Sequence, residues 1–109
     1  MIIKMTLQQR PFDSISSGVK TVEMRLYDEK RQGIKQGDII EFTSPKGEII
    51  KVKVKAVKPF KGFEELYDNY PKEALGYIEG ESCSPDDMLE YYSPEDVKRY
   101  GVVAIEIEL

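Results

Sequence analysis

Three charged side chains near the start of the sequence have the types and the spacing needed to bind one small polar ligand. Glu23 and Arg25 are two residues apart, and Lys20 comes three residues before Glu23. In a strand, residues i and i+2 face the same side about 7 Å apart, so Glu23 and Arg25 can contact one ligand. An arginine fork suits a phosphate or a carboxylate, whereas a carboxylate accepts hydrogen bonds from an exocyclic amine such as that of cytosine. The pair therefore has the chemistry to read a nucleotide.

The same spacing also fits ordinary ion pairs with residues of neighbouring strands, which are common on protein surfaces and contribute little to stability. Lys20 adds a second alternative. If the strand begins early enough to include Lys20, alternation places this lysine on the face opposite Glu23. Lys20 joins Glu23 and Arg25 only if a bend near Gly18 redirects it, and spacing alone leaves both alternatives open.

A β-strand is predicted to position Glu23 and Arg25, because apolar and polar residues alternate from Thr21 onward. Its apolar face, which must point to the core, consists of Val22, Met24 and Leu26. Ahead of this strand, residues 11–15 predict one or two helical turns, and Gly18 is expected to end them in a left-handed conformation.

The rest of the pattern predicts a small domain rich in β-structure. Further strands are expected at the N-terminus and at residues 39–43, 48–57 and 102–109, with a hairpin turn at residues 44–47. Short helices are expected at residues 28–31 and 60–67, and after the serine caps Ser84 and Ser93, each of which is followed by proline and acidic residues. These elements predict an α+β fold: a closed or nearly closed β-barrel of about five or six strands with short peripheral helices, in one domain over residues 1–109.

The composition limits the chemistry that this domain can use. The 109 residues contain no histidine and one cysteine, Cys83, so Ser-His-Asp and Cys-His catalysis are excluded and no internal disulfide can form. A lone thiol and the lack of a long apolar segment predict a cytoplasmic protein that neither spans a membrane nor is secreted. No metal site and no cofactor are predicted.

Charge is divided unevenly along the chain. Residues 1–62 contain 13 Lys and Arg against 7 Asp and Glu, a net charge of +6, whereas residues 63–109 contain 3 against 13, a net charge of −10. Only the basic part is suited to phosphates, and the overall charge of −4 argues against non-specific coating of nucleic acid. The acidic part leaves open another kind of function, a module that binds an unidentified protein partner.

The ordered motifs resemble a known family. Gly18, Lys20, Glu23 and Arg25 match the Gly-x-Lys-x-x-Glu-x-Arg signature of ASCH domains, which are members of the PUA-like superfamily. The supporting motifs are Pro11-Phe12, Gly37-Asp38 and the closing strand from Tyr100-Gly101. Residues 26–31 look like an extension found in stand-alone prokaryotic members. The resemblance implies a PUA-like β-barrel whose cleft binds RNA or a nucleotide through Lys20, Glu23 and Arg25.

The resemblance also implies an enzymatic alternative. Some small ASCH proteins are amidohydrolases that remove acyl groups from acylated cytidine with a lysine, a threonine and a more distant glutamate. Lys20 matches that lysine, but Glu23 stands where the threonine is expected and Thr21 comes earlier, which favours binding over catalysis. Lys20 and Glu23 are the catalytic candidates, with Glu79 or Glu81 as the distal carboxylate. A weak ribonuclease also stays open, since Lys and Arg can stabilise negative charge in a transition state.

A run of lysines offers a second candidate surface. Its members are Lys51, Lys53, Lys55, Lys58 and Lys61. Along a strand, alternate residues are about 6.6 to 7 Å apart, which is comparable to phosphates along an extended nucleic-acid strand. The alternative is that these lysines protect a sheet edge or pair with Glu106 and Glu108 on the last strand.

Tyrosines are frequent in the second half of the chain and have two interpretations. They are Tyr67, Tyr70, Tyr77, Tyr91, Tyr92 and Tyr100. Their rings could stack on bases, as in proteins that bind single-stranded nucleic acid. Tyrosines at helical spacing beside apolar residues more often cover a core, and this interpretation is favoured here. Cys83 has no predicted partner and is given no role.

Overall fold

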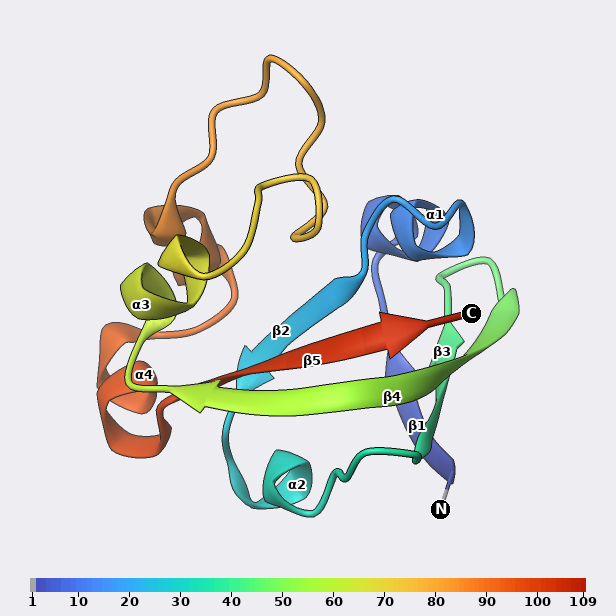
Figure 1. Cartoon of the computed structure of the whole chain (residues 1–109), viewed down its shortest axis with the longest axis horizontal. Coiled ribbons are helices and arrows are strands. Elements are labelled where there is room, and N and C mark those ends of the chain that lie inside the picture. The colour runs from blue at the N-terminus through green and yellow to red at the C-terminus, as the bar shows by residue number, and fades with distance from the viewer. Residues whose placement is uncertain (1) are drawn as a thin grey trace.

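A five-stranded mixed sheet is the framework of the protein (Figure 1). The structure is a computed structural model that describes residues 2–109. The strands are β1 (Ile2–Thr6), β2 (Val22–Leu26), β3 (Ile39–Thr43), β4 (Ile49–Phe60) and β5 (Val102–Glu108). They lie in the order β1-β3-β4-β5-β2, with β1 parallel to β3 and the other neighbours antiparallel. The sheet curls into a half-barrel with β1 and β2 at its edges, which confirms the predicted α+β, PUA-like fold.

Short helices lie around the sheet, as predicted. They are α1 (Gln9–Ser16), α2 (Glu29–Gln32), α3 (Phe63–Asp68), the 3-10 helix η1 (Pro85–Glu90) and α4 (Pro94–Tyr100). Figure 1 shows α3 and α4 near one end of the sheet and α1 near the other. Helix α3 contacts η1, β4 and β5. The long connection between α3 and η1 therefore begins and ends beside the same end of the sheet.

The serine caps begin both elements predicted in the acidic half, but the first of these is a 3-10 helix. The Ser93 hydroxyl accepts a hydrogen bond from the Asp96 N–H and starts α4. Ser84 and Asp87 form a reciprocal capping box at the start of η1. Within η1 only Met88 is buried. Because packing of an apolar face supplies most of the stability of a short α-helix, this segment has little to favour the α form.

The hydrophobic core has two parts that share β5. The first fills the half-barrel and consists of Phe12, Ile15, Ile34, Ile40, Phe42, Val52, Val54, Val103, Ile105 and Ile107. The second lies between the β2 and β5 strands and the helices α3 and η1, and consists of Val22, Met24, Leu26, Phe63, Leu66, Leu75, Met88, Val102 and Ala104. Strand β5 is therefore buried on both faces over its first half. On the second face, Glu106 is partly exposed and Glu108 is exposed.

The lysine-rich strand β4 is central, so the prediction that its lysines protect a sheet edge is wrong. Strand β4 pairs with β3 on one side and with β5 on the other. It also continues to Phe60, a residue that was predicted to be helical. The alternative of cross-strand pairing is confirmed for Lys58, whose Nζ lies 3.0 Å from a carboxylate oxygen of Glu106.

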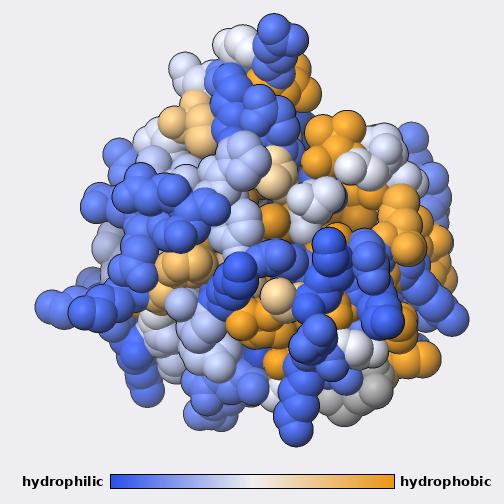
Figure 2. All heavy atoms as spheres, in the orientation of Figure 1, coloured by the Kyte–Doolittle hydropathy of each residue, from blue (hydrophilic) through white to orange (hydrophobic). Residues whose placement is uncertain are grey.

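The visible surface is mostly polar. In Figure 2, hydrophilic side chains project from much of the face shown, and hydrophobic atoms appear in patches between them. Of the helices within residues 2–109, none is long and apolar enough to cross a membrane. The longest, α1, has eight residues.

Candidate functional site

Lys20, Glu23 and Arg25 converge into one buried cluster, which we call the floor cluster. The Lys20 Nζ lies 3.2 Å from Glu23 Oε1, and the Arg25 Nη2 lies 2.8 Å from Glu23 Oε2. Their side chains are 9%, 4% and 15% exposed, respectively. These charges are therefore not solvated surface pairs, and Lys20 lies on the same side as the other two.

The bend before β2 explains the position of Lys20. Gly18 has a φ of +84° and follows α1, as predicted. The backbone N–H groups of Val19 and Lys20 both donate to the carbonyl oxygen of Ser14, which turns the chain back along the end of the helix. Strand β2 begins only at Val22. Lys20 therefore precedes the strand and does not follow its alternation.

Glu23 uses both carboxylate oxygens within the protein. Its Oε1 contacts Lys20 and accepts a hydrogen bond from the Met24 N–H at 3.3 Å. Its Oε2 accepts from the Arg25 Nε at 2.9 Å and contacts Nη2. Burial by itself would raise the pKa of Glu23, but the positive charges of Lys20 and Arg25, with their hydrogen bonds, lower it below the ordinary value. The carboxylate is thus ionised and the floor cluster carries two positive charges and one negative.

Arg25 also connects the two edge strands of the open sheet. Its Nη2 donates to the carbonyl oxygen of Thr6, the last residue of β1, at 3.0 Å. Burial opposes the charge of Arg25, but the Glu23 carboxylate and the nearby Tyr92 raise its pKa above the ordinary value. The guanidinium is held as a fixed cation between β2 and β1.

The floor cluster opens into a cleft of about 490 Å³. Its walls come from the end of β1, the start of α1, residues 75–77, residues 81–82, residues 87–88 and residues 90–92. This volume lies within the usual range for small-molecule sites. Segments from both the basic and the acidic part of the chain therefore enclose one polar hollow.

Gly76 brings the far wall of the cleft against Lys20. It has a φ of +104°, and a Cβ at this position would lie 3.0 Å from the Lys20 Cδ. Just before it, the Ala74 carbonyl oxygen accepts hydrogen bonds from the N–H groups of Thr21 and Val22. The segment around Gly76 thus packs on the stem of the lysine. Nothing in the local sequence indicated this contact.

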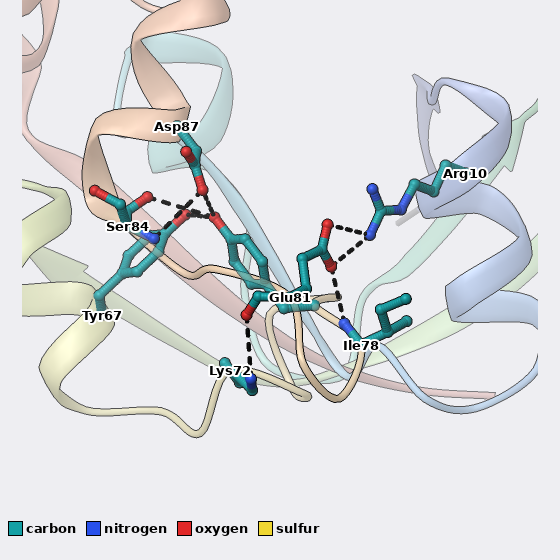
Figure 3. A network of polar contacts seen from close by, with 8 residues as sticks. Arg10, Tyr67, Lys72, Ile78, Glu81, Ser84 and Asp87 are labelled. Atoms are coloured by element: carbon teal, nitrogen blue, oxygen red, sulfur yellow. Dashed lines mark hydrogen bonds and ion pairs between the residues drawn. The ribbon is translucent and has the colours of Figure 1, made fainter.

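At the mouth of the cleft, Arg10 and Glu81 face each other across 71 positions of sequence; we call them the mouth pair. Figure 3 shows Arg10 on α1 directed at Glu81 on the connection between α3 and η1. The Arg10 Nη2 donates to both carboxylate oxygens of Glu81, at 2.5 and 2.6 Å. The hydrogen bonds from Arg10 and from the Ile78 N–H lower the pKa of Glu81. Arg10 was not among the site residues predicted from the sequence.

A tyrosine network supports the wall beside the mouth pair. The hydroxyls of Tyr67 and Tyr77 are 2.8 Å apart, and the Tyr77 hydroxyl donates to Asp87 at 2.7 Å (Figure 3). Five of the six tyrosines considered from the sequence pack against the second part of the core, which confirms that they mainly cover it: Tyr67, Tyr70, Tyr77, Tyr92 and Tyr100. The exposed Tyr91 lines the cleft together with Tyr77 and Tyr92.

The other residues considered from the sequence lie elsewhere. Thr21 lines a separate hollow of about 400 Å³ beside Tyr70 and Glu106. Glu79 is exposed and is not part of the cleft wall, whereas Glu81 belongs to the mouth pair. Cys83 is largely exposed, and the slight desolvation of its thiol, together with the nearby negative charge of Asp87, raises the pKa of that thiol.

Acid is expected to destabilise the protein through Glu23. A carboxyl group with a lowered pKa in the folded state contributes stability above its unfolded pKa, near 4.5, and loses that contribution as the pH falls through the folded pKa. We expect the free energy of unfolding to decline below about pH 5, and to decline less steeply in Glu23→Gln. Urea unfolding of both proteins at several pH values from 7 to 3 measures this difference. Parallel pH profiles would contradict the assignment.

Comparison with known proteins gave a family match and similar solved structures, of which two are described below. A family model described as ASCH domain matches residues 5–109. The crystal structure of hypothetical protein PH0355 is 39% identical with a TM-score of 0.84, and the match covers 99% of this chain and 98% of that one. The solution structure of protein PF0455 from Pyrococcus furiosus is also 39% identical with a TM-score of 0.70, covering 99% and 96%. Both relatives come from Pyrococcus. No curated protein matches the chain.

Proposed function

The chain belongs to the ASCH domain family, and from this premise we propose that it binds RNA or a nucleotide in the cleft above the floor cluster. One observation carries the proposal: Lys20 and Arg25 are buried around a single carboxylate at the base of a cleft of about 490 Å³. The cluster has one more positive charge than negative. A buried charge is energetically costly unless it is paired with an opposite charge. A surplus buried cation that faces a cleft therefore favours a role for the cleft in binding an anionic or acceptor-rich ligand.

Lys20 supplies hydrogen-bond donors that the protein does not use. Its Nζ carries three N–H groups, and within residues 2–109 its contact is with one oxygen of Glu23. Lys20 lines the cleft, so the remaining donors are available to a ligand there. The partner should therefore present acceptors, such as phosphate oxygens or the carbonyl oxygens of a base.

Glu23 acts as a positioning residue in this proposal. Both of its oxygens already contact Lys20, Arg25 or the Met24 N–H, and a carboxylate has about four acceptor sites. The spacing of Glu23 in the sequence suggested that it could accept hydrogen bonds from the amine of a base. Because its acceptor sites are already occupied, it is less suited to that role. Its role is to hold two cations at a fixed separation, facing the ligand.

Hydrolysis has less support than binding. The residue at the position of the expected threonine is the fully engaged Glu23. Thr21 is exposed and lines the other hollow, which Lys20 also lines, but within residues 2–109 the Thr21 hydroxyl makes no hydrogen bond to Lys20, whose Nζ contacts Glu23. A threonine nucleophile needs a base within hydrogen-bond reach. We therefore assign the cleft to binding.

Loss of either cation is expected to weaken binding. A hydrogen bond to a charged group contributes about 1.5–3 kcal/mol, so Lys20→Ala and Arg25→Ala should each lower affinity for nucleoside monophosphates or a short single-stranded RNA roughly tenfold or more. Calorimetric titration at fixed salt measures the affinities. Lys98→Ala and Arg99→Ala remove the same charge from the exposed face of α4 and should bind as the parent does. Unchanged affinity in both floor variants would rule out the cleft.

A further inference from the structure

The mouth pair offers a second place where the cleft meets a ligand. Arg10 and Glu81 both line the cleft, but they come from opposite walls, α1 and the connection between α3 and η1. Their side chains are 65% and 27% exposed, in contrast to the buried floor cluster. The mouth pair therefore lies in the same cleft as the floor cluster and is closer to solvent.

Arg10 is only partly engaged by the protein. A guanidinium has five N–H donors, and Glu81 contacts only the Nη2 of Arg10. Its Nε and Nη1 groups make no hydrogen bond within residues 2–109. A fork of this kind is suited to the geometry of a phosphate, which offers several oxygens to adjacent donors.

Glu81 is held in place without help from Arg10. Its Oε1 accepts a hydrogen bond from the Ile78 N–H at 2.9 Å, and its carbonyl oxygen accepts one from the Lys72 Nζ at 3.1 Å (Figure 3). If Arg10 turned to another anion, the Glu81 carboxylate would keep the Ile78 bond and partial exposure to water. Releasing Arg10 therefore leaves no unsatisfied buried charge.

We propose that Arg10 is a phosphate subsite at the mouth of the cleft and that Glu81 occupies this subsite in the free protein. This inference rests on the proposed function and adds the position of the phosphate to it. A phosphate group of the ligand replaces the Glu81 carboxylate on Arg10, while the rest of the ligand contacts the floor cluster. Glu81 thus acts as an internal competitor that makes binding selective for phosphate-bearing ligands.

Charge supports this division of roles. In the free protein, Glu81 neutralises Arg10, so the mouth pair has no net charge, while the floor cluster has one surplus positive charge. Asp87 and Glu90 also line the cleft and add negative charge to its wall, so Arg10 is the cation outside the floor cluster that can meet a phosphate. A phosphate monoester carries nearly two negative charges at neutral pH, and it attracts Arg10 more strongly than a single carboxylate does. A nucleoside without phosphate has nothing to displace Glu81 with.

The test compares matched ligands on matched variants. The ligands are the four nucleosides, the four nucleoside 5′-monophosphates and a single-stranded hexaribonucleotide with hydroxyls at both ends. The variants are Arg10→Ala and Glu81→Gln. Arg99→Ala and Glu73→Gln serve as controls, since each makes the same charge change at an exposed position outside the cleft. Titration calorimetry at fixed salt gives the ratio of monophosphate to nucleoside affinity.

We expect Arg10→Ala to reduce this ratio about tenfold through weaker monophosphate binding, with nucleoside affinity unchanged. Glu81→Gln should raise monophosphate affinity severalfold, and both controls should match the parent. A parallel loss for the hexaribonucleotide in Arg10→Ala would show that the subsite takes a phosphodiester, and an unchanged hexaribonucleotide affinity would show that it takes a terminal phosphate.

Two results separate the failure of this inference from the failure of the proposed function. If the parent binds nucleotides but the ratio is unchanged in Arg10→Ala, or Glu81→Gln weakens monophosphate binding, the phosphate subsite is refuted and the cleft assignment stands. If the parent binds none of the probes, the proposed function is refuted and the subsite is refuted with it.

Discussion

Replacing Glu23 by alanine is expected to lower the free energy of unfolding by about 3–5 kcal/mol, the usual cost of removing one partner of a buried ion pair. The substitution leaves Lys20 and Arg25 charged, close together and largely buried without the carboxylate between them. Small domains are stable by about 5–15 kcal/mol in total, so this loss is a large share. Urea unfolding at pH 7, followed by circular dichroism, measures it.

A matched control separates the buried pair from a general effect of charge. Glu108→Ala removes the same charge from an exposed position at the end of β5 and should change stability by less than about 0.5 kcal/mol. Glu23→Gln keeps the shape and the acceptor oxygen and should fall between the parent and Glu23→Ala. A loss below about 1 kcal/mol in Glu23→Ala would contradict the role given to this carboxylate.

Gly101→Ala is the second substitution with a large expected effect, a loss of about 3 kcal/mol. Gly101 ends α4 with φ +71° and ψ −172°, a conformation that is essentially limited to glycine and costs other residues about 1–3 kcal/mol. An added Cβ would also lie 2.9 Å from the carbonyl oxygen of Phe60, so the backbone of β4 or β5 must shift. Such overpacking adds about 1–3 kcal/mol. Thermal and urea unfolding measure the change.

Gly33→Ala is the corresponding control. Gly33 has φ −85°, and an added Cβ would meet no atom within 4 Å. Alanine there restricts the unfolded chain without straining the folded one and should be neutral or slightly stabilising. Equal effects of the two substitutions would show that the strain at Gly101 has been misassigned.

Local patterns in the sequence predicted the elements that position the floor cluster. Alternation predicted β2, and the serine and proline signals predicted the starts of η1 and α4. The spacing of Glu23 and Arg25 correctly placed them on one face of the strand. These predictions succeed because each depends on residues a few positions apart, where backbone geometry fixes the arrangement.

The sequence could not predict features that depend on packing between distant segments. The position of Lys20 depends on two hydrogen bonds to Ser14, and the contact between Arg10 and Glu81 joins residues 71 positions apart. The central position of β4 follows from its pairing with both β3 and β5, which its lysines do not reveal, so protection of a sheet edge stayed open as one explanation for them. In each case the missing information was tertiary, and local spacing carries none of it.

The floor and the mouth of the cleft come from different parts of the chain, and this has a consequence for comparing ASCH proteins with one another. The signature residues belong to β2 and the turn before it, whereas much of the rim comes from the connection between α3 and η1 and the residues after it. Evolution can therefore alter the rim by substitution or insertion while the signature stays intact. Two members that share the signature need not share a ligand. Assigning ligand specificity within the family therefore requires comparing the residues that form the rim of the cleft.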